Sequence, residues 1–233
     1  MKAILLHHAG GDKYAFKNMQ QWLLPEIQSL AVEAPGRSDR FSEPLLNDIH
    51  AITNDIFHQL KNEINQDYFF VGVSMGTLVT YLLCHQLKEN NLPLPKHLFL
   101  ASRLSPDAYL QEPTIMHISS DAFWKVVIQY NGVPDALIQH QELRELYEPI
   151  LRADFEALEK YNISHEAKEP LDIPATILIG NEDSRNITLQ TAQTWNHQFA
   201  NDLAFKEFDG GHFFVYENEE VSNYIKKILR NKV

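Results

Sequence analysis

The chain has 233 residues, with 20 lysines and arginines against 31 aspartates and glutamates, which gives a formal net charge of −11. This balance argues against nucleic-acid binding, because such binding needs cationic side chains along the phosphates. No apolar run reaches membrane-spanning length, the N-terminal sequence lacks a cleavable export signal, and Cys84 is the single cysteine. We therefore expect a soluble, cytoplasmic protein with no membrane span, no internal disulfide and one domain over residues 1–233.

Strand and helix patterns alternate in the first part of the chain. Apolar residues at helical spacing predict a helix over residues 47–65, and a second, more apolar helix follows Ser74 and ends near Asn90. Short apolar runs predict four strands in this part, at residues 2–7, 29–33, 68–71 and 98–101.

Residues 106–165 carry no strand pattern. Helical stretches at 121–130 and 142–161 are predicted there, with breaks at Gly132, Pro134 and Pro149. Strand patterns return at 175–179 and 203–208, and helices are predicted at about 188–199 and 219–230. This order predicts an α/β fold with a mostly parallel sheet, helices on both faces and a helical insertion at about 106–165. Active groups of such sheets lie at the carboxyl ends of the strands.

Ser74 is the candidate nucleophile. It is the centre of Gly72-Val73-Ser74-Met75-Gly76, which follows an aromatic strand and opens a helix. A nucleophile elbow of the α/β-hydrolase fold has this form, because glycines two residues before and after the serine relieve crowding between strand and helix. The alternative is a serine that caps an ordinary strand-to-helix turn. The context favours the elbow.

His212 is the candidate general base. In this fold the triad follows the order serine, acid, histidine. His212 comes after a predicted strand and a Gly-Gly pair, in the loop before the last helix, where an imidazole can reach the elbow. Other histidines lie within predicted helices, where surface or packing roles are expected: His50, His58, His85, His140 and His197.

The acid that orients the imidazole is expected in the loop after the preceding strand, Gly180-Asn181-Glu182-Asp183. We favour Asp183, which lies further from the strand end. Glu182 remains a rival, and Asp183 has an alternative role as a helix cap.

The oxyanion hole needs two backbone N–H donors, one from the residue after the nucleophile and one from the loop after an earlier strand. Met75 and Ala9 meet these requirements, and Ala9 precedes Gly10-Gly11. We expect no metal at His7 and His8, because adjacent histidines on a strand point to opposite faces and lack partners at ligand spacing.

Taken in order, these segments resemble those of the type II thioesterases of nonribosomal peptide and polyketide synthesis, which belong to the α/β-hydrolase superfamily. The segments that carry the resemblance are Ala9-Gly10-Gly11, Ala34-Pro35-Gly36-Arg37, the Ser74 elbow, Asp183 and Gly210-Gly211-His212-Phe213-Phe214. The resemblance implies an editing enzyme that hydrolyses acyl groups from phosphopantetheine thioesters on carrier protein domains. It also implies a Ser74, Asp183, His212 triad, a helical lid over 106–165 and no cofactor. We expect a monomer.

Two other functions remain open at this point. One is a small carboxylesterase or lipase-like hydrolase of oxygen esters, and the other is a non-catalytic hydrolase-like binding scaffold. Three arginines near strand ends, Arg37, Arg40 and Arg103, are candidates for contacts with a pantetheine phosphate or an acidic carrier helix. Ion pairs with acids such as Asp39 and Glu43 are the alternative.

Overall fold

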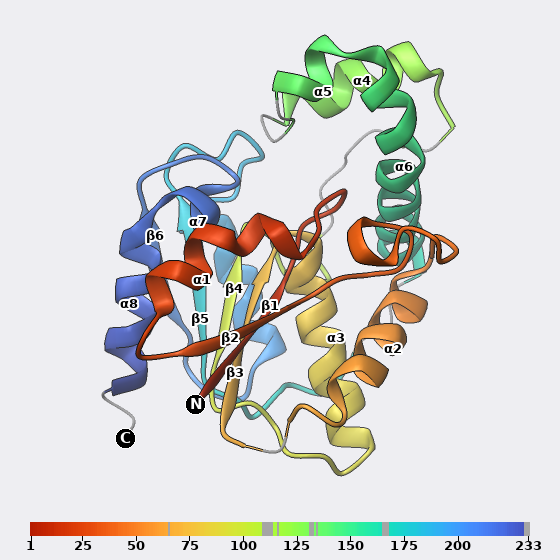
Figure 1. Ribbon diagram of the computed structural model, residues 1–233. Coiled ribbons are helices and arrows are strands. Elements are labelled where there is room, and N and C mark those ends of the chain that lie inside the picture. The colour runs from red at the N-terminus through yellow and green to blue at the C-terminus, as the bar shows by residue number, and fades with distance from the viewer. Residues whose placement is uncertain are drawn as a thin grey trace.

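Six parallel strands form one sheet in the computed structural model, in the order β2-β1-β3-β4-β5-β6 (Figure 1). The strands are β1 Lys2–Leu6, β2 Gln28–Val32, β3 Tyr68–Val73, β4 Leu98–Ala101, β5 Ala175–Gly180 and β6 Ala204–Phe208. The predicted strands and the predicted α/β class with a mostly parallel sheet are thereby confirmed. The structure describes residues 1–64, 66–108, 114–115, 117–130, 133, 135–164 and 168–230.

Helices connect the strands. The α-helices are α1 Lys17–Leu23, α2 Ile49–Leu60, α3 Met75–Glu89, α4 Ser120–Gln129, α5 Asp135–Gln139, α6 Gln141–Ser164, α7 Phe214–Glu217 and α8 Glu219–Arg230. Short 3-10 helices are η1 Lys13–Phe16, η2 Ser38–Arg40 and η3 Thr191–Gln198. Within the described ranges, no helix combines the length and apolarity that a bilayer span requires.

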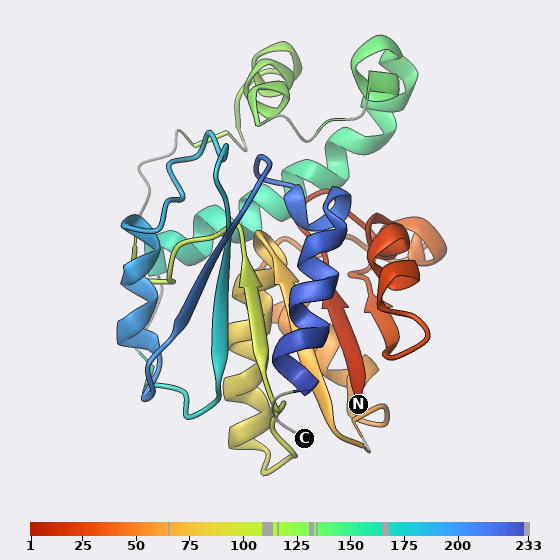
Figure 2. The ribbon, with the colours of Figure 1, turned by 90° about the vertical axis from the view of Figure 1, so that its left-hand side faces the viewer.

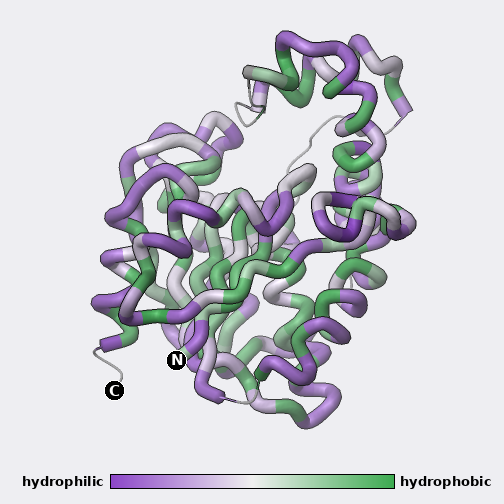
Figure 3. The backbone as a smooth tube through the Cα atoms, in the orientation of Figure 1, coloured by the Kyte–Doolittle hydropathy of each residue, from purple (hydrophilic) through white to green (hydrophobic). Residues whose placement is uncertain are grey.

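The two faces of the sheet bury separate hydrophobic clusters. Ile4 and Leu6 of β1 face a cluster that contains α2, α3 and Trp195 of η3, whereas Ala3 and Leu5 face a cluster that contains α1 and α8. Successive strand residues point to opposite faces, so each central strand must be apolar throughout. Figure 2 shows the helices on both sides of the sheet, and Figure 3 shows the hydrophobic segments concentrated in its strands.

Burial explains most of the local structure. β3 is buried along its whole length, as expected for a strand covered on both faces. α8 instead buries one stripe of side chains, Val221, Ile225 and Leu229. Their spacing of four residues matches a helix that packs one face on the sheet. α2 begins after Asp48, whose carboxylate accepts the Ala51 N–H at 2.9 Å as an N-cap.

The predicted break at Pro149 was wrong. α6 runs from Gln141 to Ser164 with Pro149 inside it. A proline in a helix interior removes one hydrogen bond and costs about 3 kcal/mol. Residues that follow it bury their side chains, including Leu151, Ala157 and Leu158, and this burial offsets that cost. The predicted breaks at Gly132 and Pro134, and the boundary at His165, lie outside the described residues.

Two further elements differ from the sequence prediction. The helix expected at 188–199 is the 3-10 helix η3, and it spans only Thr191–Gln198. No helix was predicted between β1 and β2, where η1 and α1 are found. The buried residues Phe16, Met19 and Leu23 recur at helical spacing there, so the pattern was present in the sequence.

The loops after β1 and β3 lie at a switch point of the sheet, where the connections from two adjacent strands leave in opposite directions. From β1 the chain goes outward to β2, and it returns to place β3 on the other side of β1. Ligand sites of open parallel sheets lie at such switch points, beyond the carboxyl ends of the strands. Figure 2 shows α6 crossing above this edge.

The start of α3 packs directly against β1 at Gly76. A Cβ atom there would lie 2.1 Å from the Leu6 carbonyl oxygen and 2.7 Å from the His7 carbonyl oxygen. Neither neighbour is a side chain that can rotate away. A glycine is therefore required where the elbow helix touches the sheet.

We predict that Gly76→Ala lowers the free energy of unfolding by at least ~3 kcal/mol, because the added methyl group overlaps backbone atoms. Gly211→Ala is the matched control, since its Cβ would lie 3.8 Å from the nearest atom found, the Glu182 carbonyl oxygen. The control is expected to stay within ~1 kcal/mol of wild type. Chemical denaturation measures both, and equal stability of the two variants would contradict the close approach.

Candidate active site

Ser74 occupies a strained turn between β3 and α3. Its backbone angles are φ 54° and ψ −112°, outside the regions that L-residues normally adopt. Several hydrogen bonds hold the turn. The Ser74 N–H donates to Ala101 O at 2.9 Å, the Thr77 N–H donates to Ser74 O at 3.0 Å, and the Thr77 hydroxyl accepts the Ala101 N–H at 3.1 Å. The neighbouring strand β4 thus fixes the turn, as a nucleophile elbow requires.

Asp183 and His212 form a buried pair. His212 Nδ1 lies 2.8 Å from Asp183 Oδ2, and the two side chains are 3% and 0% exposed. The other carboxylate oxygen, Oδ1, accepts the Arg185 N–H at 2.9 Å. A carboxylate only accepts hydrogen bonds, so Nδ1 carries the proton and Nε2 is left as the basic nitrogen.

Hydrogen bonds between the loops after β5 and β6 place Asp183, not Glu182, beside His212. The Asn181 N–H donates to Phe208 O at 2.9 Å, and the Glu182 N–H donates to Gly210 O at 3.0 Å. This pairing leaves the Glu182 side chain exposed to solvent. The alternative that the sequence left open therefore has a geometric answer: Asp183 is the carboxylate bonded to the imidazole.

Ser102 connects the histidine loop to the elbow. Its hydroxyl donates to the His212 carbonyl oxygen at 2.6 Å, and it directly follows Ala101, the partner of the Ser74 N–H. His212 Nε2 is buried and has no hydrogen-bond partner within the described part of the chain, so Ser74 and His212 are not bonded to each other there. Catalytic hydrogen bonds are often long before substrate binds. Ser102 is not among the residues predicted from the sequence, although its position at a strand end was a signal.

Two backbone donors at the elbow are unoccupied. Among the described residues, neither the Ala9 N–H nor the Met75 N–H makes a hydrogen bond. One follows β1 and the other follows Ser74, and β1 and β3 are adjacent in the sheet. Unpaired amides at this edge can stabilise negative charge on a substrate oxygen. The role of Ala9 and Met75 as oxyanion donors stays a prediction.

His7 and His8 are packed as neutral side chains. His7 Nε2 accepts the Ala34 N–H at 3.4 Å, and its Nδ1 lies 2.7 Å from His8 O. Burial, followed by the charge of Arg37, lowers the pKa of His7 to about 4. Burial lowers the pKa of His8 to about 3, and its Nδ1 lies 2.7 Å from the Tyr216 hydroxyl. Both histidines therefore shape the Ala9 loop. The described residues contain no group of three or more metal-ligating side chains.

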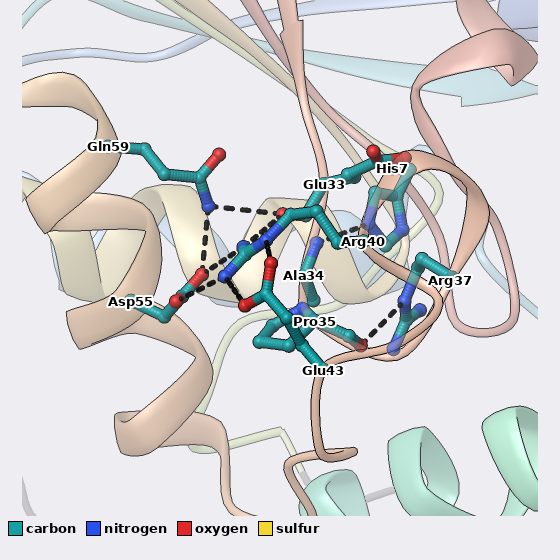
Figure 4. A network of polar contacts seen from close by, with 9 residues as sticks. All are labelled: His7, Glu33, Ala34, Pro35, Arg37, Arg40, Glu43, Asp55 and Gln59. Carbon is teal, nitrogen blue, oxygen red and sulfur yellow. Dashed lines mark hydrogen bonds and ion pairs between the residues drawn. The ribbon is translucent and has the colours of Figure 1, made fainter.

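Arg37 and Arg40 form ion pairs instead of offering free charges. Arg37 makes two bonds to the buried Asp154, at 2.6 and 2.8 Å. Arg40 makes two bonds to Asp55, also at 2.6 and 2.8 Å, and it binds Glu43 as well (Figure 4). Asp154 is not among the residues predicted from the sequence. An acid one helical turn from Ile150, Leu151 and Leu158 was the signal that could have revealed it.

A cavity of about 470 Å³ lies between the Ala9 loop and helices α4 to α6. Apolar and aromatic side chains dominate its wall. Its lining side chains from the segment between β4 and β5 include Val127, Tyr130, Leu137, Tyr147 and Phe155. Phe123 and Trp124 pack instead among the lid helices, and Leu158 belongs to the main core.

Ser74 lines a second, smaller cavity of about 40 Å³. Polar and cationic side chains surround it, among them Arg103, Asn162 and Arg185. The Arg185 guanidinium also stacks on Tyr130 at 4.6 Å from the ring centroid. The serine therefore lies beside a polar pocket, and the Ala9 loop borders the apolar cavity.

We predict that Asp183→Asn lowers kcat by about 10²- to 10⁴-fold, because an amide no longer holds the Nδ1–H tautomer or stabilises the imidazolium. Glu182→Gln is the matched control and is expected to change kcat by less than about twofold. Turnover of an activated ester by the two folded variants measures this. A loss in Glu182→Gln as large as that in Asp183→Asn would reverse the assignment of the acid.

A second prediction concerns stability and pH. The folded pKa of His7, about 4, lies below its ordinary value of 6.5, so the unfolded chain binds a proton first as the pH falls. The stabilisation that neutral His7 contributes to the fold is complete above pH 6.5 and is lost as the pH falls toward 4. The free energy of unfolding should fall by about 1 kcal/mol per pH unit between pH 6 and 5 for each such histidine.

Chemical denaturation at pH 7, 6 and 5 tests this slope. His7→Gln should reduce the slope by the contribution of one histidine. His85→Gln should do the same away from the site, because burial, with Lys168 and Lys88, lowers the pKa of His85 to about 4. Slopes equal to wild type in both variants would contradict the prediction.

Comparisons with known proteins agree with this geometry. The family model described as "Thioesterase domain" matches residues 2–231. The gramicidin S biosynthesis protein GrsT of Aneurinibacillus migulanus is 27% identical over 231 residues, covering 99% of this chain and 89% of the relative. The medium-chain S-acyl fatty acid synthase thioesterase of Homo sapiens is 30% identical over 234 residues, with coverages of 98% and 87%.

Solved structures agree as well. The type II thioesterase BorB from the borrelidin biosynthetic cluster is 25% identical, superposes with a TM-score of 0.85, and the match covers 97% of this chain and 91% of that one. These matches span nearly the whole sequence and include the β1, β3, β5 and β6 loops that form the site. The chain belongs to the thioesterase domain family and has the α/β-hydrolase fold of its thioesterases.

Proposed function

We propose that this thioesterase hydrolyses acyl groups from the phosphopantetheine thiol of carrier protein domains, through an acyl-enzyme on Ser74. It thereby removes stalled or incorrect acyl groups from a peptide or polyketide synthase. The relatives named for gramicidin S biosynthesis and for the borrelidin cluster support this context. No cofactor is required, because every step uses side chains and backbone amides of this chain.

The observation that carries the proposal is that one loop, Ala9-Gly10-Gly11, both supplies a candidate oxyanion donor and lines the apolar cavity. The Ala9 N–H, in the loop after β1, makes no hydrogen bond within the described residues, and the same Ala9-Gly10-Gly11 segment borders the apolar cavity of about 470 Å³. An acyl chain held in that cavity brings its carbonyl group to the loop. The carbonyl oxygen then meets the Ala9 and Met75 donors, with Ser74 on the adjacent strand end.

Acylation begins when Ser74 Oγ attacks the thioester carbonyl carbon and its proton passes to His212 Nε2. Asp183 stabilises the imidazolium, and the Ala9 and Met75 N–H groups stabilise the oxyanion. The intermediate collapses with cleavage of the C–S bond. His212 returns the proton to the sulfur, and the carrier leaves as a free thiol. A thioester carbonyl has weak resonance with sulfur, so this step needs only a modest triad.

Deacylation repeats these steps with water. His212 Nε2 takes a proton as a water oxygen attacks the ester carbonyl carbon on Ser74. Collapse of the second intermediate breaks the bond to Oγ, which recovers its proton from His212. The products are the free acid and the regenerated serine.

Further parts of the proposal concern the surroundings of the site. Residues 106–165 act as a lid, since α4 to α6 border the apolar cavity on the side away from the sheet. A carrier domain is the macromolecular partner, with the acyl group delivered on its pantetheine arm. We also propose a single domain that acts as a monomer in the cytoplasm.

We predict that Ser74→Ala lowers the turnover of an acyl-carrier thioester by at least about 10³-fold, because the covalent path is lost. A fluorophosphonate probe should label wild type and fail to label this variant. Ser184→Ala, an exposed serine in the loop after β5, should keep both turnover and labelling. Intact turnover in Ser74→Ala would refute the nucleophile.

The same assay separates the alternative functions. Faster hydrolysis of matched oxygen esters than of thioesters would indicate a carboxylesterase. Absence of both turnover and labelling in wild type would indicate a binding scaffold. Formation of an ester product in place of free acid would indicate acyl transfer to another acceptor.

A further inference from the structure

Arg37 and Asp154 form a fully buried ion pair between residues 117 positions apart. Arg37 Nη1 lies 2.6 Å from Asp154 Oδ2, and Nη2 lies 2.8 Å from Oδ1. Their side chains are 3% and 0% exposed. Burying two charges is costly, and well-packed apolar residues often stabilise a fold equally well. Stability alone therefore does not explain the pair, and its contacts indicate a further role.

Both members of the pair bind the loop that carries Ala9. Asp154 Oδ2 accepts the Gly10 N–H at 2.7 Å, and Arg37 Nη1 donates to Gly11 O at 3.2 Å. Asp154 thus holds the Ala9–Gly10 peptide, and Arg37 holds the Gly11–Asp12 peptide that follows it. A charged acceptor shortens and strengthens such bonds. The Ala9 N–H lies in the His8–Ala9 peptide, which shares the Ala9 Cα with the anchored Ala9–Gly10 peptide, so the anchoring restricts the direction of this N–H.

Asp154 also brings α6 into contact with this loop. Its helical neighbours Leu151 and Phe155 line the apolar cavity. Gly10 has φ +75°, and a Cβ atom there would lie 2.3 Å from Leu151 Cδ2. The loop and the helix are therefore packed without space between them. A shift of α6 along the cavity wall must displace Gly10.

We propose that the Arg37–Asp154 pair is a positioning device that couples α6, a wall of the acyl cavity, to the oxyanion donor Ala9. The inference rests on the proposed function, in which the Ala9 N–H stabilises the transition state. An acyl chain that fills the cavity and holds α6 in place thereby also fixes the direction of the Ala9 N–H. Neither residue touches the reacting atoms, so both are positioning residues.

The neighbouring Arg40 provides a matched control. It too makes two bonds to a carboxylate, that of Asp55, and it lies in the same segment after β2 (Figure 4). Its contacts go to Glu33 O, Glu43 and Asp55, away from the Ala9 loop. Loss of this pair removes a bidentate ion pair, more exposed than Arg37–Asp154, without releasing the loop that carries Ala9.

The experiment compares Asp154→Asn, Arg37→Lys and Arg40→Gln in the full chain with an octanoyl-pantetheine thioester. Asp154→Asn should lower kcat by about 10- to 100-fold with KM changed less than about threefold, since transition-state contacts weaken more than ground-state contacts. Arg37→Lys retains the positive charge, so its kcat should fall by a smaller factor. Arg40→Gln should keep wild-type kcat, even where it lowers the melting temperature.

A second readout separates positioning from stability. An alkyl boronic acid, which forms a tetrahedral adduct at the serine, should bind more weakly to Asp154→Asn by about the factor lost in kcat. Folded Asp154→Asn and Arg37→Lys with wild-type kcat and boronate affinity would overturn the inference. So would an equal loss in Arg40→Gln. If Asp154→Asn does not fold, Arg37→Lys decides alone. Failure of the proposed function is distinguishable, because wild type itself would then be inactive on the thioester.

Discussion

All strands of this sheet run in the same direction, and the candidate site depends on this constraint. The loops after β1, β3, β5 and β6 emerge at one edge because parallel strands end together. Ala9, Ser74, Asp183 and His212 thus come from positions spread over most of the sequence and follow strands that end on the same side of one sheet. Helices on both faces bury the strands, so the edge is held rigidly and the loops can carry polar chemistry.

Backbone hydrogen bonds between neighbouring loops fix the positions of the candidate catalytic residues. The Ser74 turn is bonded to the end of β4, and the β5 loop is bonded to the β6 loop. Ser102 then joins β4 to the histidine loop through the His212 carbonyl oxygen. Each catalytic candidate is positioned by a partner on the next strand. A strained serine is maintained because its surroundings determine its conformation.

The helical segment between β4 and β5 makes two kinds of contact with the candidate site. Its long helix supplies apolar wall residues, and through Asp154 it also contacts the loop after β1. Arg37 completes this link from the segment after β2. Under the proposed function, substrate binding and transition-state stabilisation would be connected through α6 and through the buried Arg37–Asp154 ion pair. In enzymes that must act on varied acyl groups, such a connection relates chain fit to rate.

The sequence by itself determined the alternation of strands and helices, the elbow around Ser74, the histidine loop and the family resemblance. These are local patterns: apolar periodicity, glycine spacing and the order of motifs along the chain. It did not decide between Glu182 and Asp183, nor reveal Ser102 or Asp154, and it wrongly predicted a break at Pro149. Those outcomes depend on which loops pair and which helix faces are buried. Only tertiary contacts decide that, because partners such as Arg37 and Asp154 are separated by 117 positions in the chain.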